Sequence, residues 1–277
     1  MSYIRITKND VSSDGTIDHI DIKNSTTIFC CDLQNLTKLP LWPTVKEVYC
    51  NNCLSLTELP LWPNITRVNC YNCSSLTKLP LWFNITRVIC KFCSSLTELP
   101  LWPNIINVDC GYCRNLTKLP SWSAVKNIDC SNCPGLSELP LWPNITNIDC
   151  SDLQNLTELP LWPNITNVYC ENCSGLTKLP LWTNIIIVDC MNCECLTELP
   201  LWPTIEIIYH NIKQNFSIDN NQKLHGSCLI CYIETKLIKC NTCSLCICKN
   251  CINNWHIVNN DNKCMQCKQI FNKQKIN

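Results

Sequence analysis

The sequence has only one alanine, Ala124, and five glycines among 277 residues, while Asn, Ile, Lys and Cys are abundant. Such a bias is typical of a chain encoded by an A+T-rich genome, and it excludes no function. The chain contains no glycine-rich phosphate loop, hydrolase triad or catalytic pair of carboxylates, so the enzyme classes that depend on these motifs have no support. An excess of charge is also lacking. Because 22 basic and 22 acidic residues give a net charge of zero, we expect neither a nucleic acid nor a membrane as partner.

Two further absences decide how the 27 cysteines are interpreted. No stretch approaches the roughly 18 apolar residues that span a bilayer. The first residues, Met1 to Ile6, lack the apolar core of a signal peptide. Since stable disulfides belong to secreted proteins, we expect a cytoplasmic protein whose cysteines are thiols or metal ligands. The Asn-Ile-Thr sequons, such as the one at Asn64, are then incidental.

A twenty-residue unit recurs nine times between about Asn35 and Ile208. Its consensus is Leu-Pro-x-Trp-Pro-x-Ile-x-x-Val-x-Cys-x-x-Cys-x-x-Leu-Thr-x, and a clean copy begins at Leu139. A unit this short cannot bury its apolar face alone, so successive units must stack on one another. The sequence therefore predicts a repeat solenoid over about 25–210, followed by a different kind of structure.

The apolar line of each unit, Ile-x-x-Val-x-Cys-x-x-Cys-x-x-Leu, resembles the cysteine-containing leucine-rich repeat, whose pattern is Leu-x-x-Leu-x-Leu-x-x-Cys-x-x-Leu. The resemblance covers about residues 25–210 and recurs in phase. The residues themselves predict a short Val-x-Cys strand with alternate side chains turned inward, and stacked units then form a parallel β-sheet. The two prolines of Leu-Pro-Leu-Trp-Pro favour an extended, polyproline-like convex limb rather than a helix.

The tryptophan of each unit is expected to stack on its neighbours in a buried ladder, which we favour over a role in binding carbohydrate or bases. The Cys-x-x-Cys pairs of the repeats could suggest metal sites. However, Leu33 and Leu153 replace the second cysteine in otherwise regular units. Leucine can fill the space of a buried thiol but cannot bind zinc, so we expect these cysteines to be packed thiols.

Two surface ladders follow from the period. One alternates mostly between lysine and glutamate, from Lys38 to Glu198, and is expected only to favour the stacking register. The other occupies outward strand positions, where solenoids bind partners. The candidate residues are Tyr49, Asp109, Asp129, Asp149, Tyr169 and Asp189. Like charges in three consecutive units repel, and we expect no folding role for them. We therefore predict a protein substrate on the concave face, bound through a basic segment at an acidic centre.

Residues 227–277 carry a second cysteine pattern, after a polar cap or linker at 211–226. Four Cys-x-x-Cys pairs are enough for two tetrahedral zinc sites. The candidate ligands are Cys228, Cys231, Cys240, Cys243, Cys248, Cys251, Cys264 and Cys267. A segment this short has too small a core to fold alone, so two Zn²⁺ ions would supply the folding energy.

This spacing resembles a RING-type zinc finger in an all-cysteine form, over about 227–270. The family's cross-brace implies one zinc on Cys228, Cys231, Cys248 and Cys251, and the other on Cys240, Cys243, Cys264 and Cys267. The sequence departs from the family by lacking its usual histidine and by having Met265 where proline is common. Cys246 is surplus, so Cys243 with Cys246 is an alternative middle pair to Cys240 with Cys243.

The RING resemblance also implies a surface for an E2 ubiquitin-conjugating enzyme. Ile230 lies between the first two ligands, where RING ligases have an apolar E2 contact, and Trp255 matches the family's aromatic contact. Lys268 follows the last ligand, where many active members carry a cation that bridges E2 and ubiquitin. Packing within the small domain is the alternative role for Ile230 and Trp255.

Together these resemblances imply a RING-type E3 ubiquitin ligase, in which the repeats bind substrate and the RING recruits E2–ubiquitin without a covalent intermediate on the chain. The arrangement is similar to repeat-plus-RING proteins of giant amoeba-infecting, mimivirus-like DNA viruses, which would place it in a host cytoplasm. The alternative is a non-catalytic interaction adaptor with a structural zinc module. A thioester-forming ligase, like bacterial effectors with similar Leu-Pro-rich repeats, would need a larger domain than the residues after 210 can supply. Residues 1–24 are expected to cap the solenoid, with a strand-like segment at Tyr3–Ile6.

Overall fold

The computed structural model describes residues 3–17, 20, 22, 25–200 and 202–210, together with the backbone of three C-terminal strands. The chain divides into two compact units, Met1–Lys213 and Gln214–Asn277. In the described part of the chain, no helix is long and apolar enough to cross a bilayer.

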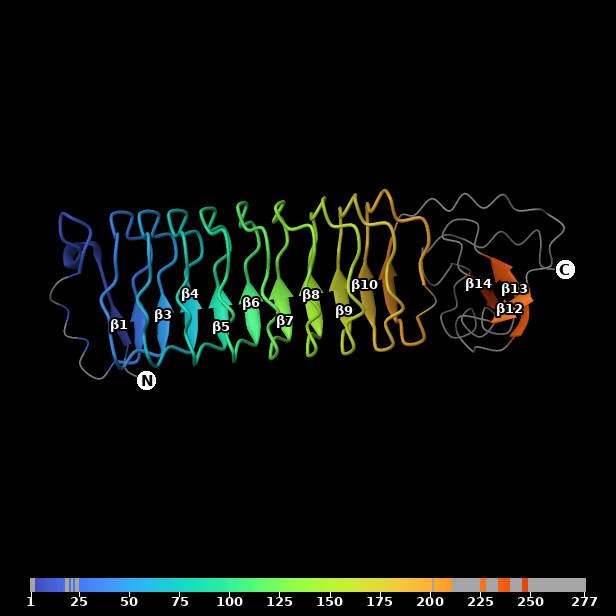
Figure 1. Cartoon of the computed structure of the whole chain (residues 1–277), viewed down its shortest axis with the longest axis horizontal. Coiled ribbons are helices and arrows are strands. Elements are labelled where there is room, and N and C mark those ends of the chain that lie inside the picture. Colours follow the sequence, from blue (N-terminus) through green and yellow to red (C-terminus); the bar gives the residue numbers. More distant parts are fainter. Residues whose placement is uncertain are drawn as a thin grey trace, which may run out of the picture. The chain divides into compact units, whose positions relative to one another are not determined.

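The first unit is a solenoid with one short strand per turn (Figure 1). Its eleven strands form a single parallel sheet in the order of the sequence, from β1 to β11. The strands are β1 (Tyr3–Arg5), β2 (Thr27–Phe29), β3 (Glu47–Tyr49), β4 (Arg67–Asn69), β5 (Arg87–Ile89), β6 (Asn107–Asp109), β7 (Asn127–Asp129), β8 (Asn147–Asp149), β9 (Asn167–Tyr169), β10 (Ile187–Asp189) and β11 (Ile207–Tyr209). A short 3-10 helix, η1 (Lys8–Asp10), follows β1. The predicted parallel-sheet solenoid is confirmed.

Each strand sits slightly earlier in the unit than the sequence suggested. In β6 the strand ends at Asp109, and the expected Cys110 comes one residue later. Val108 at the centre is 3% exposed, whereas Asn107 and Asp109 on either side point outward. Cys110 still faces the core, and its N–H donates to the carbonyl oxygen of Asp129 at 2.8 Å. The sheet ladder therefore continues for one bond beyond the strand.

A sharp turn follows each strand from β2 to β10 and places its second residue in the left-handed region, with φ between 55° and 63°. Asparagine and aspartate tolerate this conformation best among residues with a side chain. The residues at this position are Asp32, Asn52, Asn72, Phe92, Tyr112, Asn132, Asp152, Asn172 and Asn192. Several amides of this row donate to a neighbouring unit, for example Asn72 Nδ2 to Asn52 Oδ1 of the preceding unit at 3.0 Å. Two consecutive units carry bulky aromatics instead.

The repeat cysteines are buried, hydrogen-bonded thiols. In seven units the second cysteine donates its S–H to the carbonyl of the first cysteine one unit earlier, with Sγ–O distances of 2.9–3.1 Å. Burial raises the pKa of Cys53, Cys133 and Cys173 to about 12, so these groups stay neutral. Leu33 and Leu153 are buried at the same position. The pattern is that of core packing.

The tryptophan ladder is buried as predicted. Rings of successive units from Trp42 to Trp202 stack with centroids 5.9–6.3 Å apart. From Trp62 onward, each indole N–H donates to a proline carbonyl of the preceding unit at 2.8–3.0 Å. The ladder thus joins neighbouring units by stacking and by a directional bond.

The unequal spacing of the two sides bends the solenoid. Parallel strands lie about 4.8 Å apart, whereas the equivalent tryptophans are 5.9–6.3 Å apart. The limb that contains the tryptophans is therefore the longer side, and the sheet face is concave. The limb is extended and non-helical between successive turns, as its prolines predicted.

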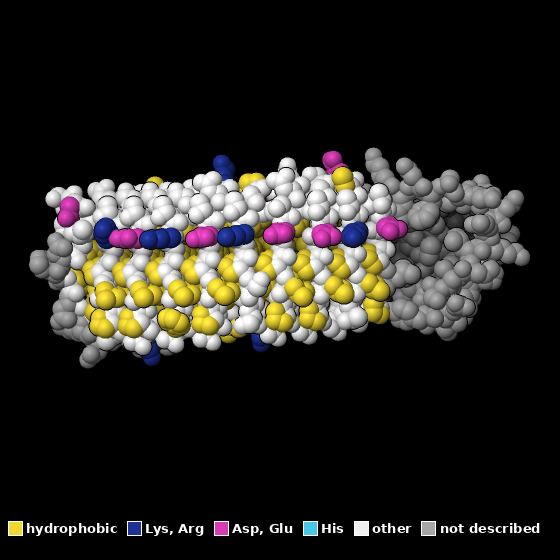
Figure 2. Space-filling model, viewed as in Figure 1, with side chains coloured by type: hydrophobic (Ala, Val, Ile, Leu, Met, Phe, Trp, Pro, Cys, Tyr) yellow, Lys and Arg dark blue, Asp and Glu magenta, His cyan; other side chains and the backbone are white. Residues whose placement is uncertain are grey.

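The surface of this limb is apolar and is bordered by a row of charges that mostly alternate in sign (Figure 2). The leucines at the third position of the Leu-Pro-Leu-Trp-Pro segment are 44–62% exposed. They are Leu41, Leu61, Leu81, Leu101, Leu141, Leu161 and Leu181. The predicted charged ladder runs from Lys38 to Glu198 and includes ion pairs at Lys38–Glu58 (3.1 Å) and Lys178–Glu158 (3.8 Å). These side chains are about half to three-quarters exposed, so each pair adds little to stability.

The second unit is described only in the backbone of its three strands, β12 (His225–Ser227), β13 (Glu234–Lys239) and β14 (Cys246–Cys248). They form an antiparallel sheet in the order β12-β13-β14. Leu237 is paired with Cys248 and Lys239 with Cys246. The predicted residues Cys228, Ile230, Cys231, Cys240, Cys243, Cys251, Trp255, Cys264, Cys267 and Lys268 lie outside the described residues.

Candidate functional site

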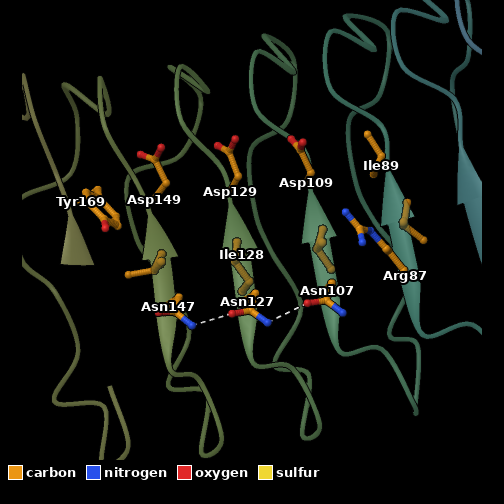
Figure 3. Close-up of a pocket in the computed structure, with 13 residues that line it drawn as sticks. Arg87, Ile89, Asn107, Asp109, Asn127, Ile128, Asp129, Asn147, Asp149 and Tyr169 are labelled. Atoms are coloured by element: carbon orange, nitrogen blue, oxygen red, sulfur yellow. Dashed lines mark hydrogen bonds between the residues drawn. The ribbon is translucent and has the colours of Figure 1, made fainter. Parts of the chain in front are cut away.

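The concave sheet face contains a shallow hollow of about 320 Å³ across β5 to β9 (Figure 3). Its floor is the backbone of the strand centres Val88, Val108, Ile128 and Ile148, whose side chains are 0–4% exposed and point into the core. Two outward rows flank this floor because the residues on either side of each strand centre point the other way. The outward residues are Arg87, Ile89, Asn107, Asp109, Asn127, Asp129, Asn147, Asp149 and Tyr169.

Four of the six predicted partner-binding residues line this hollow. Asp109, Asp129 and Asp149 form one row and Tyr169 continues it, as Figure 3 shows. Tyr49 and Asp189 lie on the same face of the sheet but are not among the residues that line the hollow. The alternation of outward positions was therefore sufficient to find the row, but not its limits.

The aspartates also have a role in folding, contrary to the expectation from sequence. Asp129 Oδ1 accepts the N–H and hydroxyl hydrogen bonds of Ser131, at 3.0 Å and 2.6 Å. Asp149 Oδ1 accepts the N–H of Ser151 at 3.1 Å. An aspartate that accepts the N–H two residues later stabilises the turn after the strand. The inference that folding does not ask for these carboxylates was wrong.

Lys91, which sequence reasoning missed, crosses two units to reach the acidic row. Its Nζ lies 2.8 Å from Asp129 Oδ2 and 4.0 Å from Asp109 Oδ1. Gly111 lies in this path, because a Cβ there would approach Asp129 Oδ1 at 3.0 Å and Lys91 Cε at 3.3 Å. A glycine opposite a lysine one unit earlier was the available signal, in a chain with only five glycines.

The three carboxylates therefore differ in their electrostatic surroundings. Burial and the neighbouring Asp129 charge raise the pKa of Asp109 above its usual 3.8, although Lys91 opposes this shift. For Lys91, burial lowers the pKa, but the hydrogen bond and the charge of Asp129 raise it overall. The charge of Asp129 is thus compensated by its ion pair with Lys91. Asp109 and Asp149 keep carboxylate oxygens directed at the hollow.

The opposite row is an amide ladder. Asn127 Nδ2 donates to Asn107 Oδ1 at 2.7 Å, and Asn147 Nδ2 donates to Asn127 Oδ1 at 2.6 Å (Figure 3). This ladder fixes the amide orientations and presents a regular set of donors and acceptors beside the floor. Asparagine at one phase of four consecutive units, from Asn107 to Asn167, was the signal in the sequence.

Aromatic residues lie beside the acidic row at the turns. Phe92 and Tyr112 stack with centroids 4.4 Å apart, and Tyr71 meets Phe92 edge-on at 5.3 Å. Lys91 Nζ lies 5.5 Å from the centroid of the Tyr112 ring. Phe92 and Tyr112 hold left-handed backbone conformations that bulky residues rarely adopt. The aromatic cluster thus lies beside Lys91 at the turns, with the Tyr112 ring near its ammonium group.

The arrangement offers carboxylates, amides and an arginine, polar groups of the kind that protein–protein interfaces contain. In the part of the chain that the structure describes, no group of three or more His, Cys, Asp or Glu is arranged to hold a metal ion. The predicted zinc ligands belong to the other unit, where only the backbone of Cys248 is described.

Comparison with known proteins finds similarity to solved structures of leucine-rich repeat proteins. No protein-family model and no curated protein sequence matches the chain. The leucine-rich repeat domain of the type III effector XopL has a TM-score of 0.41 and 17% identity, over 68% of this chain and 69% of that one. A leucine-rich cell surface protein from Faecalibacterium prausnitzii A2-165 has a TM-score of 0.26 and 12% identity, over 72% and 83% of the two chains. A leucine-rich repeat protein from Bacteroides ovatus ATCC 8483 has a TM-score of 0.20 and 11% identity, over 75% and 82%.

Proposed function

We propose that the chain is a RING-type E3 ubiquitin ligase of the host cytoplasm, in which the concave sheet face binds a protein substrate. The observation that carries the substrate-binding part is the hollow over β5–β9, where Asp109 and Asp149 stand opposite a row of asparagines. A concave sheet with polar rows is a surface on which solenoid proteins bind polypeptides. The C-terminal cysteine pattern carries the ligase part.

The zinc ligands proposed for the second unit are thiolates only, the donor type that structural zinc sites use most. The hairpin of β13 and β14 is compatible with them. Cys240 and Cys243 fall between Lys239, the last residue of β13, and Cys246, the first residue of β14, and these two strand ends are paired. A Cys-x-x-Cys pair can supply two thiolates to one ion. Two bound Zn²⁺ ions would supply folding energy to this short segment.

In this mechanism no residue of the chain acts as a nucleophile. Ile230 and Trp255 would provide the apolar and aromatic contacts for E2, and Lys268 would bridge E2 and ubiquitin. These contacts would restrict the thioester to orientations in which a substrate lysine can attack the carbonyl carbon. Restricting orientation lowers the entropic part of the barrier. The substrate lysine would be delivered by binding on the solenoid.

A second candidate function is a non-catalytic adaptor with a structural zinc module. Met265 at the usual proline position and the absent histidine favour it. Such a protein would bind its partner through the same concave face, but it would not accelerate ubiquitin transfer.

The test is discharge of E2–ubiquitin thioester onto free lysine by the zinc-loaded full chain, with a panel of E2 enzymes. A ligase accelerates discharge with at least one E2, and both Ile230→Ala and Lys268→Ala abolish the acceleration. Lys273→Ala, which removes a lysine beyond the last cysteine, serves as the matched control and keeps the rate. No acceleration with any E2 from a chain that binds two zinc ions would refute the ligase and favour the adaptor.

A further inference from the structure

We infer that the segment bound in the sheet-face hollow is an α-helix that runs along the solenoid axis and places basic side chains two turns apart against Asp109 and Asp149. This inference rests on the proposed function in that it takes the occupant of the hollow to be a polypeptide. It adds the conformation of the occupant, its direction and the spacing of its charges.

The repeat spacing selects a helix over an extended segment. Asp109 and Asp149 are two strand steps apart, which is about 9.6 Å at the usual strand separation. Two helical turns of seven residues rise about 10.5 Å, so side chains at i and i+7 match this distance to within about 1 Å. Same-face residues of an extended segment recur every 6.6–6.8 Å or so, and neither one nor two such steps matches.

The charge distribution selects which turns carry the cations. Lys91 is bonded to Asp129 at 2.8 Å and already compensates the middle carboxylate. Asp149 accepts only the N–H of Ser151 among the hydrogen bonds of the described chain. Asp109 lies 4.0 Å from Lys91 and accepts a long bond of 3.4 Å from the N–H of Gly111. The partner therefore needs cations at i and i+7 and a small neutral residue on the turn between them.

The hollow runs across the strands and is bordered by two parallel rows of side chains. The acidic row and the amide row leave each strand two residues apart, roughly 6.6–6.8 Å. Between them lies the strand backbone at Val108, Ile128 and Ile148, whose side chains are 1–4% exposed and face the core. A helix with small side chains over this backbone has the asparagine ladder along one flank and the carboxylates along the other.

The ends of the hollow limit the helix to about three turns in contact. Ile89 stands at the acidic position in the unit before Asp109, and Tyr169 stands there in the unit after Asp149. Both are suited to apolar contacts beyond the two cations. Arg87 stands at the β5 end, where the free carbonyls of a helix C-terminus are stabilised by a cation. The helix is thus oriented with its C-terminus toward β5.

The experiment measures binding of three labelled, alanine-rich peptides of about 20 residues to the full chain by fluorescence anisotropy. One carries lysines at i and i+7, one has the same composition with lysines at i and i+5, and one carries a central proline in the i, i+7 sequence. We expect the first to bind at least about tenfold more tightly than the other two, and more weakly as salt rises. Asp149→Asn should weaken the first peptide at least about fivefold.

Glu138→Gln is the matched control, because it removes one carboxylate from the exposed charged row and leaves the hollow unchanged. Equal binding of the three peptides, no binding of the i, i+7 peptide, or equal loss with Glu138→Gln would overturn the inference. Equal binding of all three that is lost with Asp149→Asn would reject the helix while leaving a polypeptide site on this face. The E2 discharge assay contains none of these peptides, so a failure of the ligase proposal can be distinguished from a failure of the helix proposal.

Discussion

The three aspartates of the hollow should respond differently to the same substitution, although they occupy one position of the repeat. In Asp129→Asn, the amide oxygen can still accept from Ser131, but an NH₂ group replaces the oxygen that lies 2.8 Å from Lys91. Both partners of this pair are about three-quarters buried, with 24% and 25% of their side chains exposed. A charge-assisted hydrogen bond at such a site is worth about 1.5–3 kcal/mol, and partial exposure reduces it, so we expect a loss of about 1–2 kcal/mol.

Asp109→Asn should have the opposite sign. Its carboxylate is partly buried beside Asp129, which raises its pKa above 3.8. A raised pKa means that the folded state binds the proton more tightly than the unfolded state, so this group opposes folding increasingly as pH rises above 3.8. Removing the charge should therefore stabilise the chain at pH 7 by roughly 0.2–1 kcal/mol, the range of a cross-strand pair. Asp149→Asn keeps an acceptor for Ser151 and should change stability by less than about 0.5 kcal/mol.

Urea unfolding of the full chain in a reducing buffer, followed by tryptophan fluorescence, measures all three changes. The gain from Asp109→Asn should shrink as the pH is lowered toward 3.8 and vanish well below it, because the wild-type carboxyl is then protonated in both the folded and the unfolded state. The reasoning would be refuted if Asp109→Asn destabilised the chain as much as Asp129→Asn, or if its gain were independent of pH.

Three further predictions concern the packing. Trp122→Ala should cost about 3–5 kcal/mol plus the loss of two stacked neighbours, and clearly more than Trp42→Ala, whose ring stacks on only one tryptophan in the described solenoid; denaturant unfolding compares them. Gly111→Val should separate Lys91 from its partner and cost about 1–2 kcal/mol, with a crystal structure or lysine NMR shift to show the displaced ammonium. Cys133→Leu should cost less than about 1.5 kcal/mol and leave the zinc content unchanged, as measured by calorimetry and metal analysis, because leucine already occupies this position in two units.

The core of the solenoid could be predicted from the sequence because a strict period removes most ambiguity. Every inward position was repeated many times, so a substitution such as Leu153 for cysteine indicated that the position is used for core packing, and Leu153 is buried there. The tryptophan ladder and the extended limb followed from residue chemistry alone. Proline disfavours a helix in the limb, and a large apolar indole in every unit stabilises the fold most when it is buried.

The site was less predictable because its important contacts skip units. Lys91 pairs with Asp129 across two turns, and it can do so only because Gly111 leaves the intervening space open. A period of twenty residues says which side chains share a row, but not which of them reach sideways into another row. The turn-stabilising bonds of Asp129 and Asp149 were missed for a related reason. They depend on the sharp turn after each strand, which the sequence pattern did not specify in detail.

The central claim is that the solenoid chooses the protein that the C-terminal unit ubiquitinates. Its most direct test is ubiquitin-remnant mass spectrometry of a eukaryotic cell extract supplied with E1, an active E2 and the full chain, compared with Asp109→Asn/Asp149→Asn and with Ile230→Ala. The proposal predicts that a defined set of modified proteins appears with the wild-type chain and is lost with either variant. A set that survives the double aspartate substitution but disappears with Ile230→Ala would contradict substrate choice by the concave face.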